Sequence, residues 1–191
     1  PEWDEAEPDA VQSEAGPGAL KAGRFPSLEF GIHLGSDDER GRMRFGDLMD
    51  AGTPEDERRL DAIADTLQFD DPINIQFTSG TTGNPKGATL THHNILNNGY
   101  FVAESQLLTE KDRLVIPVPL YHCFGMVMGN LGCISPGATM IYPGEGFEPK
   151  SVLQAVHQEK ATALYGVPTM FIAELAEPDF ETYDLSTPVS Y

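Results

Sequence analysis

The sequence is poor in basic residues and lacks long apolar runs, and both shortages exclude classes of function. It carries 12 Lys and Arg against 30 Asp and Glu, a formal net charge of −18. Nucleic acids and anionic lipids are bound through clusters of Lys and Arg, and the sequence contains no such cluster. No apolar run approaches the length of about 18 residues that indicates a membrane-spanning helix. We therefore expect no nucleic-acid partner and no transmembrane segment.

Cysteine is also scarce, and the start of the sequence lacks the features of a secretory signal. The first residues contain neither a basic segment nor an apolar core. The two cysteines, Cys123 and Cys133, match neither the spacing of a metal site nor the disulfide framework of a secreted protein. We expect both to be buried free thiols in a protein that works in the cytoplasm.

The remaining composition is that of a globular protein, with 40% hydrophobic and 22% charged residues. Residues 1–27 are acidic and contain Pro and Gly, so we expect an acidic loop or a marginal helix there. The part of the chain that carries the patterns of a folded domain is 28–191.

Apolar spacing predicts an α/β fold, a largely parallel sheet flanked by helices, because strands and helices alternate from residue 73 to residue 176. A helix over 54–67, capped by Thr53 and begun by Pro54, is predicted before this region, together with a short strand within 27–36. Thr91 or Asn94 is expected to cap the first helix of the alternating region. The other predicted strands are 73–79, 88–92, 113–120, 138–143, 161–166 and 186–191, and the other helices are 122–135, 148–160 and 168–177.

The stretch TSGTTGNPKGATLTHHN, residues 78–94, is the most informative in the chain. A flexible linker would separate two blocks, whereas here a strand pattern enters and a strand-helix pattern leaves. A Walker A loop requires Gly-Lys-Ser/Thr directly before a helix, whereas Lys86 lies between Pro85 and Gly87. A phosphate loop of another architecture fits, because glycines let backbone N–H groups approach an anion and the hydroxyls and Lys86 add donors. A plain glycine-rich turn remains the alternative.

This stretch resembles the phosphate loop of the adenylate-forming (AMP-binding) superfamily, which includes acyl-CoA synthetases, firefly-type luciferases and peptide-synthetase adenylation domains. Two further stretches match in the expected order. PLYHCFGM (119–126) resembles the aromatic-histidine motif of the family, and YGVPTMF (165–171) resembles its Val-Pro-Thr segment. The sequence around the loop is most similar to that of fatty-acyl-CoA synthetases.

The resemblance implies a two-step reaction. The carboxylate of an acid attacks the α-phosphate of ATP to give an acyl-adenylate and pyrophosphate, and the thiol of coenzyme A then displaces AMP to give a thioester. It implies ATP, Mg²⁺ and coenzyme A as cofactor and co-substrates, and a fatty acid as the small-molecule substrate.

The resemblance also assigns roles to residues. Lys86 and His122 are implied as catalytic, with His122 beside the carboxylate and the α-phosphate. Taken alone, His122 is better explained as a satisfied histidine at a helix N-terminus, and it is the surrounding motif that favours a site residue. The apolar face that includes Met126, Val127 and Asn130 either borders the acyl tunnel or packs in the core. No metal-binding cluster is predicted, and the residues implied to hold the β- and γ-phosphates are Thr78, Ser79, Gly80, Thr81, Thr82, Gly83 and Lys86.

Several motifs of the superfamily do not occur in these 191 residues. These are the later Tyr-Gly-x-Thr-Glu motif, the ribose-binding aspartate segment, the hinge and the C-terminal lysine. We therefore expect a fragment of the N-terminal domain over 28–191, without the C-terminal domain and inactive alone. Two alternatives remain: an adenylate-forming enzyme for an aromatic, amino or luciferin-like acid, and a non-catalytic nucleotide-binding fragment.

Overall fold

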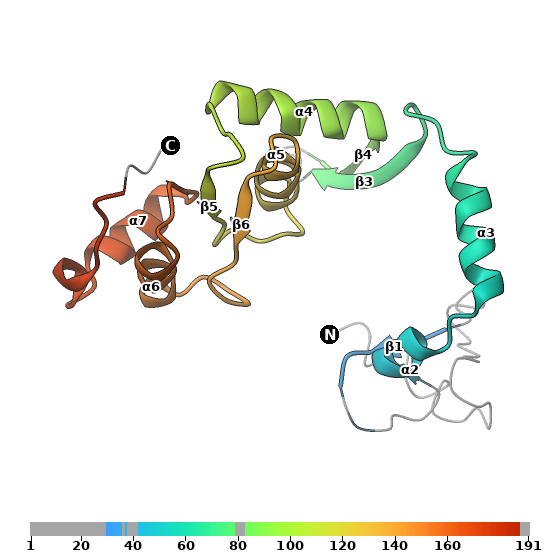
Figure 1. The fold of residues 1–191 in the computed structure, drawn as a ribbon, viewed down its shortest axis with the longest axis horizontal. Helices are drawn as coiled ribbons and strands as arrows, with labels where there is room; N and C mark the ends of the chain where they lie inside the picture. The colour runs from blue at the N-terminus through green and yellow to red at the C-terminus, as the bar shows by residue number, and fades with distance from the viewer. Residues whose placement is uncertain (1–29, 36, 38–41, 79–82, 188–191) are drawn as a thin grey trace. The chain divides into compact units, whose positions relative to one another are not determined.

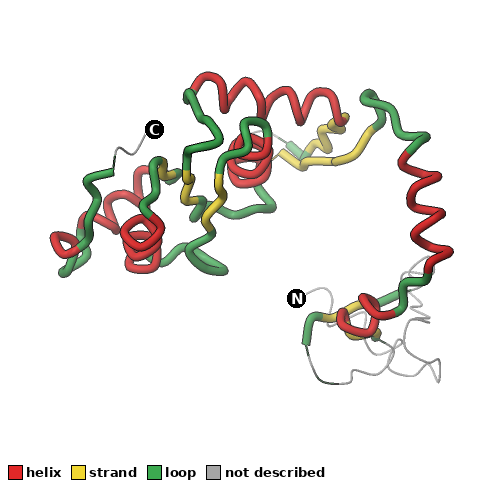
Figure 2. The backbone as a smooth tube through the Cα atoms, viewed as in Figure 1, coloured by secondary structure: helices red, strands yellow, loops and turns green. Residues whose placement is uncertain are grey.

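The computed structural model describes residues 30–35, 37, 42–78 and 83–187 (Figures 1 and 2). Contacts divide the chain into two units, Pro1–Leu67 and Gln68–Tyr191, which are described separately below. The expected loop or marginal helix over 1–27 lies outside the described residues, and the proposed domain boundary at residue 28 stays a prediction.

In the first unit, two short parallel strands, β1 (Ile32–His33) and β2 (Met43–Arg44), precede helices α2 (Phe45–Asp50) and α3 (Pro54–Ala64). The strand predicted within 27–36 is limited to β1. Helix α3 begins as predicted, because Thr53 and Asp56 form a capping box: the Asp56 N–H donates to Thr53 Oγ1 and the Thr53 N–H donates to Asp56 Oδ2.

The second unit opens with a hairpin. Strand β3 (Pro72–Thr78) pairs antiparallel with β4 (Lys86–Thr91), which differs from the parallel arrangement that dominates the prediction. The physical reason is the length of the connection, since residues 79–85 are too few for the crossover that a parallel pair requires.

Helix α4 (His92–Ser105) follows β4 directly, and both predicted caps take part in its start. The Asn94 N–H donates to Thr91 Oγ1 at 3.2 Å, and the Thr91 N–H donates to Asn94 Oδ1 at 3.0 Å. Thr91 is the N-cap and Asn94 completes the capping box.

The parallel sheet of the prediction consists of β5 (Arg113–Val115), β6 (Thr139–Ile141) and β7 (Ala163–Leu164) in the order β6-β5-β7. The strands are shorter than predicted. After β5 the chain carries Pro117 and Pro119, which lack the N–H that a ladder needs. The strand predicted over 186–191 lies largely outside the described residues, and neither Ser186 nor Thr187 is in a strand.

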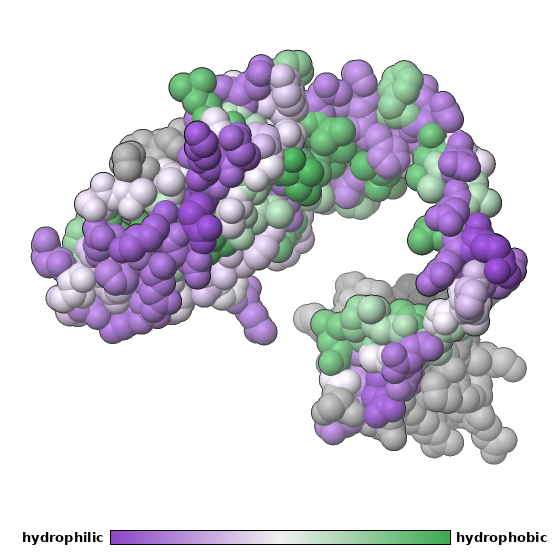
Figure 3. Space-filling view, viewed as in Figure 1, coloured by the Kyte–Doolittle hydropathy of each residue, from purple (hydrophilic) through white to green (hydrophobic). Residues whose placement is uncertain are grey.

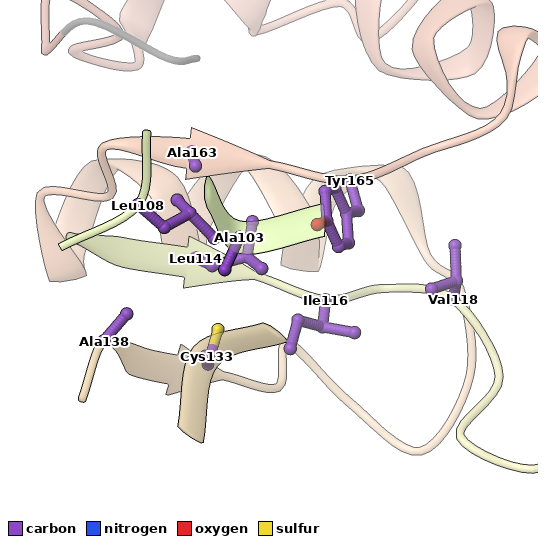
Figure 4. Close-up of a cluster of buried hydrophobic side chains, with 9 residues drawn as sticks. All are labelled: Ala103, Leu108, Leu114, Ile116, Val118, Cys133, Ala138, Ala163 and Tyr165. Carbon is purple, nitrogen blue, oxygen red and sulfur yellow. The ribbon is translucent and has the colours of Figure 1, made fainter. Parts of the chain in front are cut away.

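Helices cover both faces of this sheet (Figure 1). On one face, Leu114 packs in a cluster with Ala103 of α4 and Cys133, and Figure 4 shows Leu114 between Ala163 and Cys133. On the other face, Val115 packs against Val152 of α6. The predicted α/β fold, with a largely parallel sheet flanked by helices, is confirmed. The helices concerned are α4, η1 (Phe124–Leu131), α5 (Gly132–Ile134), α6 (Pro149–Glu159) and α7 (Pro168–Leu175), and a 3₁₀ turn, η2 (Phe180–Thr182), follows them.

The helix predicted over 122–135 begins at Phe124 and is π-helical until Leu131, after which α5 continues. It stops as predicted at Gly137, whose φ of 84° suits a glycine and whose N–H donates to Cys133 O at 3.0 Å. Both cysteines are free thiols; Cys133 is buried, whereas Cys123 is only half-buried. Burial raises the pKa of Cys133 to about 11.

None of the helices in the described ranges is long and apolar enough to cross a membrane.

Glu174 on α7 is an exception to the apolar interior of the second unit. It is 4% exposed and is the one buried charged side chain in the described part of the chain. Its Oε1 atom has no hydrogen-bond partner there. Burial raises the pKa of this carboxyl to about 7 from its ordinary 4.5, because an apolar environment disfavours the charged form.

Replacing this carboxyl should change how stability depends on pH. Between pH 4.5 and about 7 folded Glu174 keeps a proton that the unfolded chain has lost, so the free energy of unfolding falls as pH rises. From pH 5 to pH 8, we expect the free energy of unfolding of Glu174→Gln, measured relative to that of wild type, to rise by about 2–3 kcal/mol, which follows from the raised pKa. Urea unfolding of both proteins at the two pH values measures this, and a difference that is independent of pH would contradict it.

Candidate active site

The two ends of the predicted phosphate loop lie opposite each other at the loop end of the hairpin. Thr78 is the last residue of β3 and Lys86 the first of β4, and the two are register partners. The Thr78 hydroxyl donates to the Lys86 carbonyl oxygen at 3.5 Å, a long and weak bond. No ion pair among the described residues involves Lys86, whose side chain is exposed. Its ammonium is therefore available to an anion.

The rest of the predicted phosphate loop is described only in part. Gly83 lies in open space, since a Cβ added there would meet no atom within 4 Å. Ser79, Gly80, Thr81 and Thr82 lie outside the described residues, so their predicted contacts with phosphate stay predictions.

His122 is held in a tight turn directly before η1. Its Nδ1 accepts the Phe124 N–H at 3.0 Å, its own N–H donates to Pro119 O at 3.2 Å, and its carbonyl accepts the Met126 N–H at 2.9 Å. In the neutral ring, an accepting Nδ1 places the proton on Nε2. The imidazole is exposed, so Nε2–H is a donor that can face a ligand. Sequence reasoning offered a helix-terminal and a catalytic interpretation of His122. The structure places it directly before η1, and its catalytic role stays a prediction.

Gly125 allows this turn to close. A Cβ at Gly125 would lie 2.5 Å from Pro119 O and 2.9 Å from Pro119 C, both backbone atoms that cannot move aside. The glycine within the PLYHCFGM motif therefore has a steric role, and it fixes where the backbone of His122 lies.

A cavity of about 430 Å³ opens at the carboxyl ends of β5 and β6. Residues 116–121, which lead into His122, line one side, and Tyr142, residues 144–147 and Met170 line the rest. Ligands of open α/β sheets bind at this end of the strands. The Tyr142 hydroxyl donates to Asn130 Oδ1 at 3.0 Å, so one residue of the predicted acyl-tunnel face instead positions Tyr142.

A second cavity, of about 390 Å³, lies between β4, α4 and η1. Leu90, Ile95, Val127 and Met128 make it mainly apolar, and Cys123 places its edge next to His122. Val127 lines this cavity, whereas Met126 is half-buried and does not, and the acyl-tunnel interpretation of both stays a prediction. Asn94 and Asn98 add polar groups to the lining. Sequence reasoning missed both as site residues because helix-capping and surface roles explain them equally well.

Lys86 and His122 remain separate within the described part of the structure, where no hydrogen bond or ion pair joins them. The described residues also contain no group of three or more His, Cys, Asp or Glu that could hold a metal ion. The arrangement thus provides one free cation at the hairpin and one imidazole donor beside an apolar cavity.

The chain thus combines an exposed lysine in a glycine- and hydroxyl-rich stretch with a histidine held by hydrogen bonds in the segment that follows the parallel strand β5. The sequence matches the family described as AMP-binding enzyme over residues 28–191, and the chain belongs to that family.

Individual proteins that are similar to this chain have more specific names than the family. The chain is 48% identical over 186 residues to the putative acyl-CoA synthetase YngI of Bacillus subtilis, covering 94% of this chain and 34% of that protein. It is 45% identical over 175 residues to the mitochondrial medium-chain acyl-CoA ligase ACSF2 of Danio rerio, covering 91% and 29%. The anthranilate CoA ligase AuaEII in complex with anthranoyl-AMP is similar in structure, with a TM-score of 0.70 at 26% identity over 87% of this chain and 31% of that one. The chain spans about a third of the length of these relatives.

The clamp around His122 should not tolerate a side chain at Gly125. We expect Gly125→Ala to lose about 1–3 kcal/mol of unfolding free energy, the usual cost of forcing an extra carbon into a packed site. Gly146→Ala is the matched control, because Gly146 lines the same region and a Cβ there meets nothing within 4 Å. Urea unfolding measures the stability, and the imidazole NMR signals of His122 should shift in Gly125→Ala only. Equal stability of the two variants would show that the loop relaxes freely.

Proposed function

We propose that the protein containing this chain activates a fatty acid with ATP and transfers the acyl group to coenzyme A. The observation that carries the proposal is the free Lys86 ammonium at the hairpin, in a chain 48% and 45% identical to relatives named as acyl-CoA synthetase or ligase. The bound anthranoyl-AMP of the similar ligase structure supports an acyl-adenylate as the intermediate.

In the first step a carboxylate oxygen attacks the α-phosphorus and the bond to pyrophosphate breaks. Charge moves onto the departing pyrophosphate, so preorganised donors lower the barrier most. Lys86 supplies a mobile positive charge for the β- and γ-phosphates, and the weakly held Thr78 hydroxyl can turn to donate to them. Ser79, Gly80, Thr81, Thr82 and Gly83 complete the proposed cradle through hydroxyls and backbone N–H groups.

His122 is proposed to orient the reacting carboxylate. Because Nδ1 is already bound to the Phe124 N–H, the ring is fixed and directs its Nε2 proton outward. That proton can be donated to the carboxylate or to an α-phosphate oxygen. The acyl chain is proposed to enter the cavity of about 390 Å³, whose apolar lining begins at Cys123, the residue after His122.

Mg²⁺ is proposed to accompany the nucleotide. This ion usually keeps several waters and is bound by one or two carboxylates together with substrate phosphates. The described residues hold no carboxylate cluster, so the ATP phosphates are the oxygen ligands proposed for this ion here, and no residue of this chain is assigned to it. Coenzyme A is proposed as the acyl acceptor. The protein is proposed to be located in the cytoplasm.

A second candidate function is the activation of an aromatic acid. The similarity to the anthranilate CoA ligase favours it, although that identity is 26% against 48% and 45% for the acyl-CoA relatives. A non-catalytic nucleotide-binding role is the third, and the presence of both Lys86 and His122 is the observation against it. The chain alone is proposed to be inactive, since it spans about a third of its relatives.

The reaction class is tested by the exchange of labelled pyrophosphate into ATP, measured with the full-length protein. We expect exchange with octanoate and decanoate and little with anthranilate. Exchange with anthranilate alone would favour the second candidate, and no exchange with any carboxylic acid would refute the ligase assignment.

Lys86 is tested in the same assay. Lys86→Ala should weaken ATP use by about 1.5–3 kcal/mol, because a hydrogen bond to a charged group is lost. Lys111→Ala is the matched control, since Lys111 is an exposed lysine of the same unit outside the proposed cradle. If the rate depends on ATP concentration in Lys86→Ala as it does in wild type, the stretch is a plain glycine-rich turn and not a phosphate loop.

A further inference from the structure

A third cavity, of about 370 Å³, shares no lining residue with the two of the candidate active site. It lies between α6, β7, α7 and the segment that follows α7, and seven of its eight lining side chains are apolar. Polar residues cover most of the surface over α6 on the face that Figure 3 shows. The volume lies at the lower end of the range for small-molecule pockets.

The eighth lining residue is Glu174, the buried carboxyl described above. It lacks a compensating cation because the basic residues at α6 are bound to acids elsewhere. Lys150 pairs with Asp179 at 2.8 Å and Lys160 pairs with Asp184 at 3.0 Å. His157 Nδ1 accepts the Asp184 N–H at 2.8 Å.

These contacts tie the segment after α7 to α6 and close the cavity around the carboxyl. They leave Glu174 Oε1 without a partner in the described structure. Leaving a buried polar atom unpaired costs about 1–3 kcal/mol, and more if it is charged. A ligand that brings N–H donors or a positive charge to Oε1 recovers this cost, whereas a carboxylate ligand would add like-charge repulsion.

We propose that this cavity binds a small aliphatic amine, whose ammonium group pairs with Glu174 and whose alkyl chain contacts Phe171, Phe180 and Leu185. The charge preference of this site is opposite to that of the acid-activating site, so a carboxylic acid substrate is not its ligand. The inference does not depend on the proposed function, because it uses residues that take no part in that site.

The test is NMR titration of the 191-residue chain with n-hexylamine, n-hexanol and hexanoate at pH 7.5. We expect saturable shifts with hexylamine in residues of α6 and α7, binding at least tenfold weaker with hexanol, and none with hexanoate. Glu174→Gln should weaken hexylamine binding at least tenfold. Glu181→Gln, which removes an exposed carboxylate nearby on η2, is the matched control and should bind as wild type does.

Three outcomes would overturn the proposal. These are the absence of saturable shifts with hexylamine, equal affinity of Glu174→Gln and wild type, and hexanoate binding as tightly as hexylamine. Circular dichroism of each variant shows whether it is folded. If Glu174→Gln does not fold, the comparison of the three ligands on the wild-type chain still decides.

Discussion

The second unit depends on the burial of two residues of β5 on opposite faces of the sheet. Leu114 and Val115 are adjacent, point to opposite sides of the sheet, and are both 0% exposed. The backbone groups of such a strand need partners inside the protein, and β6 and β7 provide most of them in parallel register, while the Arg113 N–H donates to Thr162 Oγ1 at 2.9 Å. Because parallel strands end at one edge, the segments leading to His122 and through Tyr142 meet in one cavity.

The position of His122 follows from that edge and from close backbone packing. The chain leaves β5 through two prolines, turns at Pro119, and is held by hydrogen bonds to both sides of the histidine. Gly125 makes this possible because no side chain fits against Pro119. The imidazole is thus fixed by its own backbone neighbours rather than by another side chain, which leaves Nε2 available for a ligand.

Lys86 and Glu174 have no ion-pair partner within the described structure, and their side chains carry charges of opposite sign when ionised. Lys86 is exposed, so water solvates its ammonium at little cost until an anion arrives. Glu174 is buried, and its Oε1 atom is shielded from solvent without a hydrogen-bond partner in the described structure. The two proposals, a phosphate at the hairpin and an ammonium between α6 and α7, share the same reasoning, that an uncompensated charge favours a ligand of the opposite sign. Only the buried group carries a standing energetic cost.

Local signals in the sequence determined much of this protein. The capping boxes at Thr53 and Thr91, the helix stop at Gly137, and the alternation of strands and helices all depend on residues close together in the chain, and each prediction was confirmed. The motifs around Lys86 and His122 likewise indicated the family. Only the tertiary structure decided that β3 and β4 form a hairpin and that the strands of the sheet are shorter than predicted. It also decided that Asn130 accepts a hydrogen bond from the Tyr142 hydroxyl. It alone placed Glu174 in an apolar cavity, because burial and the lack of a partner are produced by segments distant in sequence that pack against one another.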